Sequence, residues 1–340
     1  MQHADYCRHM LAEVSRTFAI PISMLRPSLR DAVTTGYLLC RIVDTVEDEA
    51  ALDLESRERL YASFLAVLER GAAVDAFEAA FRALPGASAD LELARHLGRV
   101  AEATDSLPAR LRPVVVRWVA EMARGMGIYS HRAPGSDGLV ALSTLSDLER
   151  YCYFVAGTVG HMLTELFRVE VAELDPTRAL ALESRAEEFG LGLQLVNILK
   201  DITDDSARGW SFIPRTICWR EGLEPVDLLS EGHRRAAHAA VLPVFERADR
   251  ALDTALEYCL ALPPTATDVR LFCLLPLWMA VRTLELARGN DAQFTPSRPV
   301  KVSREEVAHL VAECHARAAD DDALRQGYAA LRGTGVRACA

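Results

Sequence analysis

The stretch GYLLCRIVDTVED, residues 36–48, indicates the fold, because an apolar helical segment leads directly into a pair of aspartates. Counting from Val33, apolar side chains recur after four, seven and ten residues, which is the spacing of one helix face. Asp44 and Asp48 are four residues apart, so on a helix both carboxylates leave the same face, one turn from each other. Two like charges held together away from water favour a cation between them.

A second stretch, QLVNILKDITDD at residues 194–205, repeats this arrangement far along the chain. Asp201 and Asp205 have the same spacing, and Asn197 lies four residues before Asp201 on the same predicted helix face. Gln194 lies seven residues before Asp201 and extends the polar row. Such a row is costly to bury without partners, so we expect it to face a wet or metal-filled cavity.

The two clusters together predict a magnesium site. Carboxylates are hard oxygen ligands, and Mg²⁺ is commonly held by one or two of them together with phosphate oxygens and waters. Two such helices facing each other would clamp a diphosphate through metal ions, so that its C–O bond can break to give an allylic cation. A single acidic cluster is more simply a solvated helix end, but two clusters with matching spacing favour the metal. The spacing and central glycine of a calcium-binding EF-hand loop are missing.

Helical spacing also dominates the rest of the chain, and half of its 340 residues are apolar. We therefore expect an all-α fold in which residues 1–340 form a single domain. The expected helices span 55–71, 89–104, 110–127, 146–168, 179–204, 226–261, 267–289 and 303–331. Proline and glycine lie at the joints between them.

The bulk composition excludes several classes of function. A net charge of −10 without any lysine- or arginine-rich run argues against nucleic-acid binding. No apolar run reaches the roughly 18 residues needed to span a bilayer, and the N-terminus is too polar for a signal peptide. We therefore expect a soluble, cytoplasmic protein. The eight cysteines form no CxxC pair and are expected to be reduced core thiols.

Beyond the two clusters, a series of segments resembles the squalene and phytoene synthase family, and within it the squalene synthases most closely. The segments, in order, are residues 14–19, 37–48, 122–127, 151–160, 194–201, 272–276 and 299–302, which read VSRTFA, YLLCRIVDTVED, MARGMG, YCYFVAGTVG, QLVNILKD, FCLLP and PVKV. The resemblance runs from about residue 6 to about residue 310. Any one segment is a weak signal, whereas the set in this order and spacing is specific.

This resemblance implies an all-α isoprenoid-synthase fold with a central active-site cavity. It implies that two or three Mg²⁺ ions are bound by four aspartates: Asp44, Asp48, Asp201 and Asp205. It implies substrate binding by a flap near the N-terminus and by later helices, through Ser15, Arg16, Phe18, Gln194, Asn197, Lys200, Phe272 and Pro276. It implies NADPH binding by Ser15, Phe18, Lys301 and Arg304.

Three residues match catalytic positions of the family: Tyr37, Arg41 and Tyr151. Arg41 lies three residues before Asp44, so it could grip phosphate with its bidentate fork or simply pair with that aspartate. Tyr151 would assist loss of the first diphosphate and direct a proton, although a tyrosine at the edge of the core has the same sequence signature. Gly157 and Gly160 would permit close approach either of a prenyl tail or of another helix.

The chain departs from the family pattern at a few positions. Lys200 replaces an arginine, and Asp204 replaces a glutamate. Trp210 stands where the family has an arginine, and the basic pair expected after residue 301 is here Ser303-Arg304. The changes at 210 and 303–304 bear on NADPH binding and on the second half-reaction, and they leave the first condensation intact.

The function that the resemblance implies is the head-to-head condensation of two farnesyl diphosphates through presqualene diphosphate to squalene, with reduction by NADPH. The nearest alternatives end at presqualene diphosphate, dehydrosqualene or phytoene without reduction. A terpene cyclase acting on one prenyl diphosphate, and a helical scaffold with a decayed site, are further alternatives. No GxGxxG motif follows a strand, so any NADPH would bind within the helical cavity. We expect a monomer or weak homodimer, with peripheral contact at the inner membrane face for product release.

Overall fold

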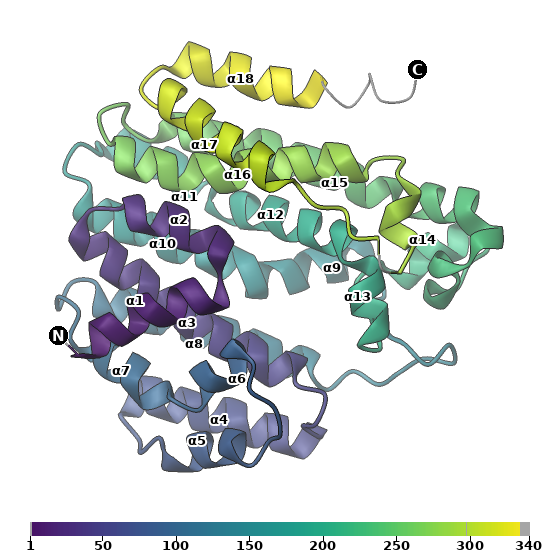
Figure 1. The fold of residues 1–340 in the computed structure, drawn as a ribbon, viewed down its shortest axis with the longest axis horizontal. Coiled ribbons are helices and arrows are strands. Elements are labelled where there is room, and N and C mark those ends of the chain that lie inside the picture. Colours follow the sequence, from purple (N-terminus) through teal and green to yellow (C-terminus); the bar gives the residue numbers. More distant parts are fainter. Residues whose placement is uncertain (1, 297, 334–340) are drawn as a thin grey trace. The chain divides into compact units, whose positions relative to one another are not determined.

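The computed structural model describes residues 2–296 and 298–333, except for the side chains of Gln2 and Arg16. It divides into two compact units, one of residues 1–131 with 161–174 and one of residues 132–160 with 175–340. Helices make up almost all of the regular structure in the described part (Figure 1), which confirms the all-α prediction. The prediction of a single domain stays a prediction.

The first unit is arranged around α3 (Pro27–Asp48), which begins with proline at its first position, where a missing N–H costs nothing. Its other helices are α1 (Gln2–Val14), α2 (Arg16–Met24), α4 (Leu54–Arg70), α5 (Asp75–Arg82), α6 (Ala89–Ala94), α7 (Leu97–Asp105), α8 (Arg112–Tyr129) and most of α10 (Thr158–Glu170). Helix α3 packs against α1, α6, α7 and α8, and most of its apolar side chains are buried. The aspartate cluster therefore lies at the end of the central helix of this unit.

The second unit is arranged around α12 (Ala186–Lys200), which packs against α15 (Arg234–Ala261), α16 (Thr267–Ala287) and a π-helical turn, η1 (Tyr153–Gly157). Its other α-helices are α9 (Leu145–Cys152), α11 (Pro176–Glu183), α13 (Ile202–Ala207), α14 (Arg215–Arg220), α15 (Arg234–Ala261), α16 (Thr267–Ala287), α17 (Arg304–Arg317) and α18 (Asp321–Gly333). The short elements are η1 (Tyr153–Gly157), the 3₁₀ turns η2 (Pro225–Leu229), η3 (Glu231–His233) and η4 (Asp291–Phe294), and the strands β1 (Val140–Ala141) and β2 (Trp210–Ser211). The strands pair in parallel, with Val140 opposite Trp210. Helix α18 packs on α16 and α17 (Figure 1).

Several predicted helices are interrupted in the structure. The segment 146–168 contains the π-helical turn η1, and the segment 179–204 is divided into α11, α12 and the start of α13. The segments 89–104 and 303–331 each form two helices, and α15 begins only at Arg234 after 3₁₀ turns. The predictions were wrong here because apolar spacing continues across a break of one or a few residues, and periodicity alone does not detect it.

Glycines allow α12 to lie unusually close to the segment 153–160. A Cβ atom on Gly160 would lie 2.0 Å from the carbonyl oxygen of Ala186, and one on Gly190 would lie 2.2 Å from that of Ala156. Such distances are impossible for a real side chain, so backbone contact requires glycine at both positions. Of the two explanations considered for Gly160, close helix packing is the one that the structure supports.

The described cysteines agree with the expectation of core thiols. Seven of them are buried and unpaired, and Cys339 lies outside the described residues. Within residues 2–296 and 298–333, no helix has both the length and the apolar character needed to cross a membrane.

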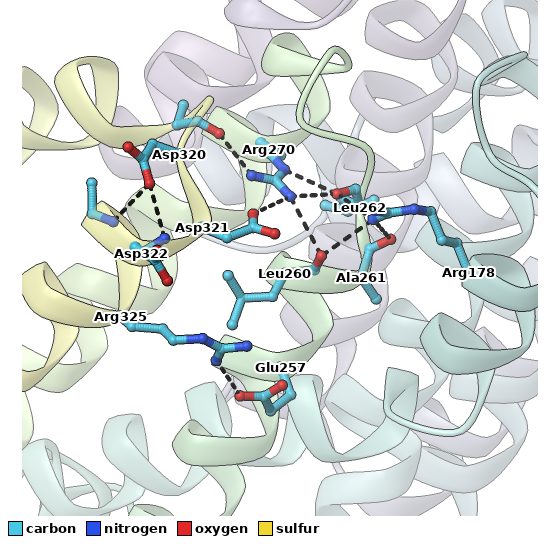
Figure 2. A network of polar contacts seen from close by, with 12 residues as sticks. Arg178, Glu257, Leu260, Ala261, Leu262, Arg270, Asp320, Asp321, Asp322 and Arg325 are labelled. Carbon is cyan, nitrogen blue, oxygen red and sulfur yellow. Dashed lines mark hydrogen bonds and ion pairs between the residues drawn. The ribbon is translucent and has the colours of Figure 1, made fainter.

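Two arginines donate hydrogen bonds to carbonyl groups at the C-terminal end of α15 (Figure 2). Arg270 of α16 is fully buried, and its Nε and Nη2 atoms donate to the Leu262 carbonyl at 3.0 and 2.6 Å. Its Nη1 atom donates to the Ala318 carbonyl at 3.0 Å, and it pairs with Asp321 at 2.7 Å. Arg178 of α11 donates to the Leu262 carbonyl at 3.2 Å. The last carbonyls of a helix have no partners within it, so cationic donors here stabilise the junction of α15, α16, α17 and α18.

We expect Arg270→Met to lower the free energy of unfolding by about 3 kcal/mol, because buried carbonyls would lose a charged donor. Urea denaturation followed by circular dichroism measures the change. Arg178→Met is the matched control, since Arg178 is partly exposed and contributes to the same carbonyls; we expect about 1 kcal/mol. A loss for Arg270→Met no larger than that of the control would contradict the importance of this junction.

Candidate active site

The first aspartate pair lies in the last turn of α3. Asp44 is half-buried, whereas Asp48 is exposed and is the last residue of the helix. Because both belong to one continuous helix, as the spacing predicted, their side chains leave the same face. Their role as metal ligands stays a prediction.

The charge of Asp44 is incompletely compensated by its surroundings. Burial raises the pKa of the Asp44 carboxyl to about 7; Arg41 lowers it, and the charges of Asp48 and Asp90 raise it. The ionised carboxylate is therefore unfavourable when only the chain's own groups surround it. A divalent cation beside Asp44 and Asp48 would supply the missing positive charge.

Arg41 is held by a partner that the sequence analysis did not identify. Its Nε donates to Oδ1 of Asp90 at 2.8 Å, and its Nη2 donates to Oδ2 at 3.1 Å. Burial alone would lower the pKa of Arg41, but the hydrogen bonds to Asp90 and the charges of Asp44 and Asp90 raise it above its ordinary value. Asp90 lies in the first turn of α6, and its local sequence gives no sign of what it contacts. The predicted pairing with Asp44 is thus only a charge interaction, and the bidentate contact belongs to Asp90.

The predicted flap and the predicted wall residue Tyr37 lie together in the first unit. Ser15 caps α2, its Oγ atom accepting a hydrogen bond from the backbone N–H of Phe18 at 3.1 Å. The Phe18 ring lies 5.5 Å from the Tyr37 ring, centroid to centroid. Burial raises the pKa of Tyr37, and a hydrogen bond with Ser15 and the charge of Arg41 oppose this shift. The side chain of Arg16 lies outside the described residues.

The second aspartate pair lies at a break between two helices, which corrects the prediction of one continuous helix. Helix α12 ends at Lys200 and α13 begins at Ile202, with Asp201 between them at φ −104° and ψ 15°. Backbone bonds from Asp201 N–H to the Asn197 carbonyl and from Asp205 N–H to the Asp201 carbonyl, at 2.9 and 2.8 Å, still maintain a helical turn. The four-residue relation therefore survives the break.

Cations of the chain already accompany the second pair. Lys200 Nζ donates to both carboxylate oxygens of Asp201 at 2.8 and 2.6 Å. Asp205 is 5% exposed and is paired with Arg208. Of the predicted polar row, Asn197 is exposed and Gln194 is half-buried, as a row facing a wet space would require.

Tyr151 lies in the last turn of α9 and is 4% exposed. Its ring stacks on Phe212 with centroids 4.8 Å apart, and Phe212 stacks on Trp210 at 5.5 Å. Trp210 thus completes an aromatic stack behind Tyr151. The π-helical turn η1 begins two residues later; such turns are frequent at functional sites.

Arg247 of α15, which sequence reasoning also missed, connects the helix of Tyr151 to α12. Its Nη1 and Nη2 atoms donate to the two oxygens of Glu188 at 2.9 and 2.6 Å, and its Nε donates to Glu149. Glu149 lies two residues before Tyr151 on α9. This ion-pair network therefore ties α9, the helix that carries Tyr151, to α12 and α15.

The other predicted residues of the second unit differ in exposure. Phe272 and Pro276 are buried in α16, as expected for an apolar lining. Lys301 is exposed before α17, and Arg304 is the exposed first residue of that helix. Cations so exposed can reach an anionic ligand from solution, and their role in NADPH binding stays a prediction.

The donor set fits Mg²⁺. Among the residues that the structure describes, no group of three or more histidine, cysteine or acidic side chains could hold a metal ion. Mg²⁺ is satisfied by one or two carboxylates plus waters and phosphate oxygens. Each aspartate pair offers ligands of that kind and number.

We expect Asp44→Asn to raise the melting temperature of the metal-free chain at pH 8. The folded state raises the pKa of Asp44 from 3.8 to about 7, so the aspartate's destabilising effect grows as pH rises through this window. The neutral amide removes that effect, and differential scanning calorimetry in EDTA measures it at pH 5 and pH 8. Asp48→Asn, at an exposed position, is the control and should shift the melting temperature little. A lower melting temperature for Asp44→Asn at pH 8 would contradict the uncompensated charge.

Known proteins resemble this chain over most of its length. The squalene/phytoene synthase family matches residues 11–306. The squalene synthase of Schizosaccharomyces pombe is 28% identical over 310 residues, which are 91% of this chain and 65% of that protein. The squalene synthase of Eremothecium gossypii is 29% identical over 308 residues, 90% of this chain and 66% of that protein. The chain thus spans just under two thirds of the length of these relatives.

A solved structure, the complex of TcSQS with the ligand BPH1237, aligns with a TM-score of 0.82 at 26% identity, covering 100% of this chain and 94% of that one. The likeness confirms the expected isoprenoid-synthase type of helical fold. Since the family match extends over most of the sequence and includes both aspartate pairs, this chain belongs to the squalene/phytoene synthase family.

Proposed function

We propose that this chain joins two farnesyl diphosphates head to head through presqualene diphosphate and, with NADPH, completes the reaction to squalene. The observation that carries the proposal is the half-buried, incompletely compensated Asp44 beside Asp48 and Arg41, an arrangement suited to a cation and a diphosphate. Membership of the family, and the name squalene synthase borne by its relatives, support the substrate class.

The two aspartate pairs are the proposed Mg²⁺ ligands: Asp44 and Asp48 on α3, and Asp201 and Asp205 at the junction of α12 and α13. When bound, the ions would stabilise the negative charge of the departing diphosphate. Each pair leaves most coordination positions open for diphosphate oxygens and water, as Mg²⁺ commonly requires.

The chain's own cations and rings supply the rest of the first step. Arg41 would donate hydrogen bonds to diphosphate oxygens, and Lys200 would do so beside Asp201. Phe18 lies on the flap that Ser15 caps, and its ring contacts Tyr37 on α3. This contact would keep water from the allylic cation, which water would otherwise quench.

Tyr151 is the proposed proton-handling group. Cyclopropane formation releases a proton, and a phenol of ordinary pKa is a poor base by itself. We propose that Tyr151 donates a hydrogen bond to the leaving diphosphate and passes the released proton towards it. Its stacking on Phe212 would hold the phenol in one orientation. Phe272 and Pro276 would line the apolar region in which the second rearrangement occurs.

Lys301 and Arg304 are the proposed cations for NADPH, with Ser15 and Phe18 on the flap. One observation favours a second candidate, a synthase that ends at dehydrosqualene or presqualene diphosphate without reduction. Ser303, which replaces part of the expected basic pair, instead caps α17 through a hydrogen bond from the Glu306 N–H at 3.1 Å. The proposed site for the NADPH phosphates would thus be less cationic than the resemblance implies.

We further infer that the protein works in the cytoplasm as a monomer or weak homodimer, with peripheral contact at the inner membrane face. Membrane contact is expected because a hydrocarbon product formed from two prenyl chains is insoluble in water and must be delivered to lipid.

The reaction is tested with purified protein, Mg²⁺ and farnesyl diphosphate, with and without NADPH, and with mass spectrometry of the products. We expect squalene with NADPH, and presqualene diphosphate or dehydrosqualene without it. The same hydrocarbon in both reactions would favour the second candidate. A cyclised product from one diphosphate, or unreacted substrate in both, would contradict head-to-head condensation.

Asp48→Asn and Asp201→Asn are each expected to reduce turnover by about a hundredfold or more, because each removes a ligand for the ion that stabilises the leaving group. Steady-state assays across a Mg²⁺ titration measure the loss, and circular dichroism checks the helical content. Asp75→Asn, at an exposed position in the first turn of α5, is the control and should keep full activity. Full activity of either cluster variant would contradict the metal role.

A further inference from the structure

Asp90 holds the guanidinium of Arg41 from the side. Nε and Nη2 of Arg41 donate to the two carboxylate oxygens of Asp90 at 2.8 and 3.1 Å. This is the parallel two-bond geometry in which arginine and carboxylate interact most specifically. The two side chains are 34% and 33% exposed, so the pair is partly shielded from solvent and partly accessible.

The contact leaves part of the arginine available to a ligand. A guanidinium has five N–H donors in one plane, and Asp90 engages only one edge of it. Because two bonds fix that edge, the plane cannot rotate, and the remaining donors point in a set direction. Arg41 lies less than one turn before Asp44 on α3, so its guanidinium belongs to the surroundings of the first aspartate pair.

Asp90 is itself on a firmly held element. Ser88 caps α6, accepting the N–H of Leu91 at 3.2 Å, and Leu91 and Leu93 are buried. Helix α6 packs against both α1 and α3. A carboxylate on such an element can fix the orientation of a long side chain that reaches it from α3.

The negative charge of Asp90 bears on why this residue contacts Arg41. An additional carboxylate near a diphosphate site weakens the attraction of that site for an anion. Arg41 interacts with the charge of Asp44 as well as with that of Asp90. A neutral partner for Arg41 would avoid the repulsion between Asp90 and a bound diphosphate. The carboxylate of Asp90 is therefore best explained by the orientation that its two hydrogen bonds impose on the Arg41 guanidinium.

We propose that Asp90 is a positioning residue, which holds the Arg41 guanidinium in the orientation that binds a substrate diphosphate. The inference rests on the proposed function, since it takes Arg41 to be a diphosphate-binding group. Asp90 itself touches no substrate, and its effect passes entirely through Arg41.

The test is a double-mutant cycle on Asp90→Asn and Arg41→Gln in the full chain. Calorimetry measures the binding of inorganic pyrophosphate with Mg²⁺, and steady-state kinetics measures KM and kcat for farnesyl diphosphate. We expect Asp90→Asn to weaken pyrophosphate binding and raise KM by about tenfold with kcat nearly unchanged. The double variant should behave like Arg41→Gln alone, because Asp90 has no effect without Arg41. Asp90→Glu should recover part of the affinity.

Asp105→Asn is the matched control, because Asp105 forms an exposed pair with Arg112 at 2.7 Å in the same unit, and it should leave KM unchanged. Additive effects in the double variant, or a fall in kcat and melting temperature without a change in KM, would overturn the positioning role. A parent chain that binds no Mg²⁺–pyrophosphate would overturn that role together with the diphosphate site. Coupled binding in a chain that makes no head-to-head product would uphold the positioning of Arg41 and contradict only the proposed reaction.

Discussion

A half-buried carboxylate with too little positive charge around it is the constraint on which the candidate site depends. Asp44 has one arginine near it, yet that arginine is shared with Asp90, and Asp48 adds a second negative charge. Such a group destabilises the chain without a ligand, because burial disfavours the ionised form. Its presence at the end of the central helix of the first unit is understandable if a cation completes the site.

The negative charge of the second aspartate pair is compensated by other side chains of the protein. Lys200 binds both oxygens of Asp201, and Arg208 accompanies the buried Asp205, so the negative charge is balanced within the chain. If Mg²⁺ took over that balance, both cations would become available to phosphate oxygens. The two pairs are therefore similar in spacing but unequal in charge balance, and we expect them to respond differently to removal of metal.

Two arginines, the half-buried Arg247 and the fully buried Arg270, connect the helices of the second unit that carry its proposed site residues. Arg247 connects α9, which carries Tyr151, to α12, and Arg270 joins the ends of α15 and α17 to α16, which carries Phe272. Close contact of α12 with the segment 153–160 depends on glycines where no side chain fits. The aromatic stack of Trp210, Phe212 and Tyr151 includes α9 through Tyr151, and Arg247 ties that helix to α12.

The amino-acid sequence by itself determined what depends on neighbours along the chain. Four-residue spacing placed Asp44 with Asp48, and family segments indicated the helical fold. Only the tertiary structure decided the long-range partners: Arg41 pairs bidentately with Asp90, 49 residues away, rather than with Asp44. It also placed a break at Asp201 inside an unbroken apolar pattern. The physical reason is that local spacing follows from helix geometry, whereas the choice of an ion-pair partner follows from how separate helices pack.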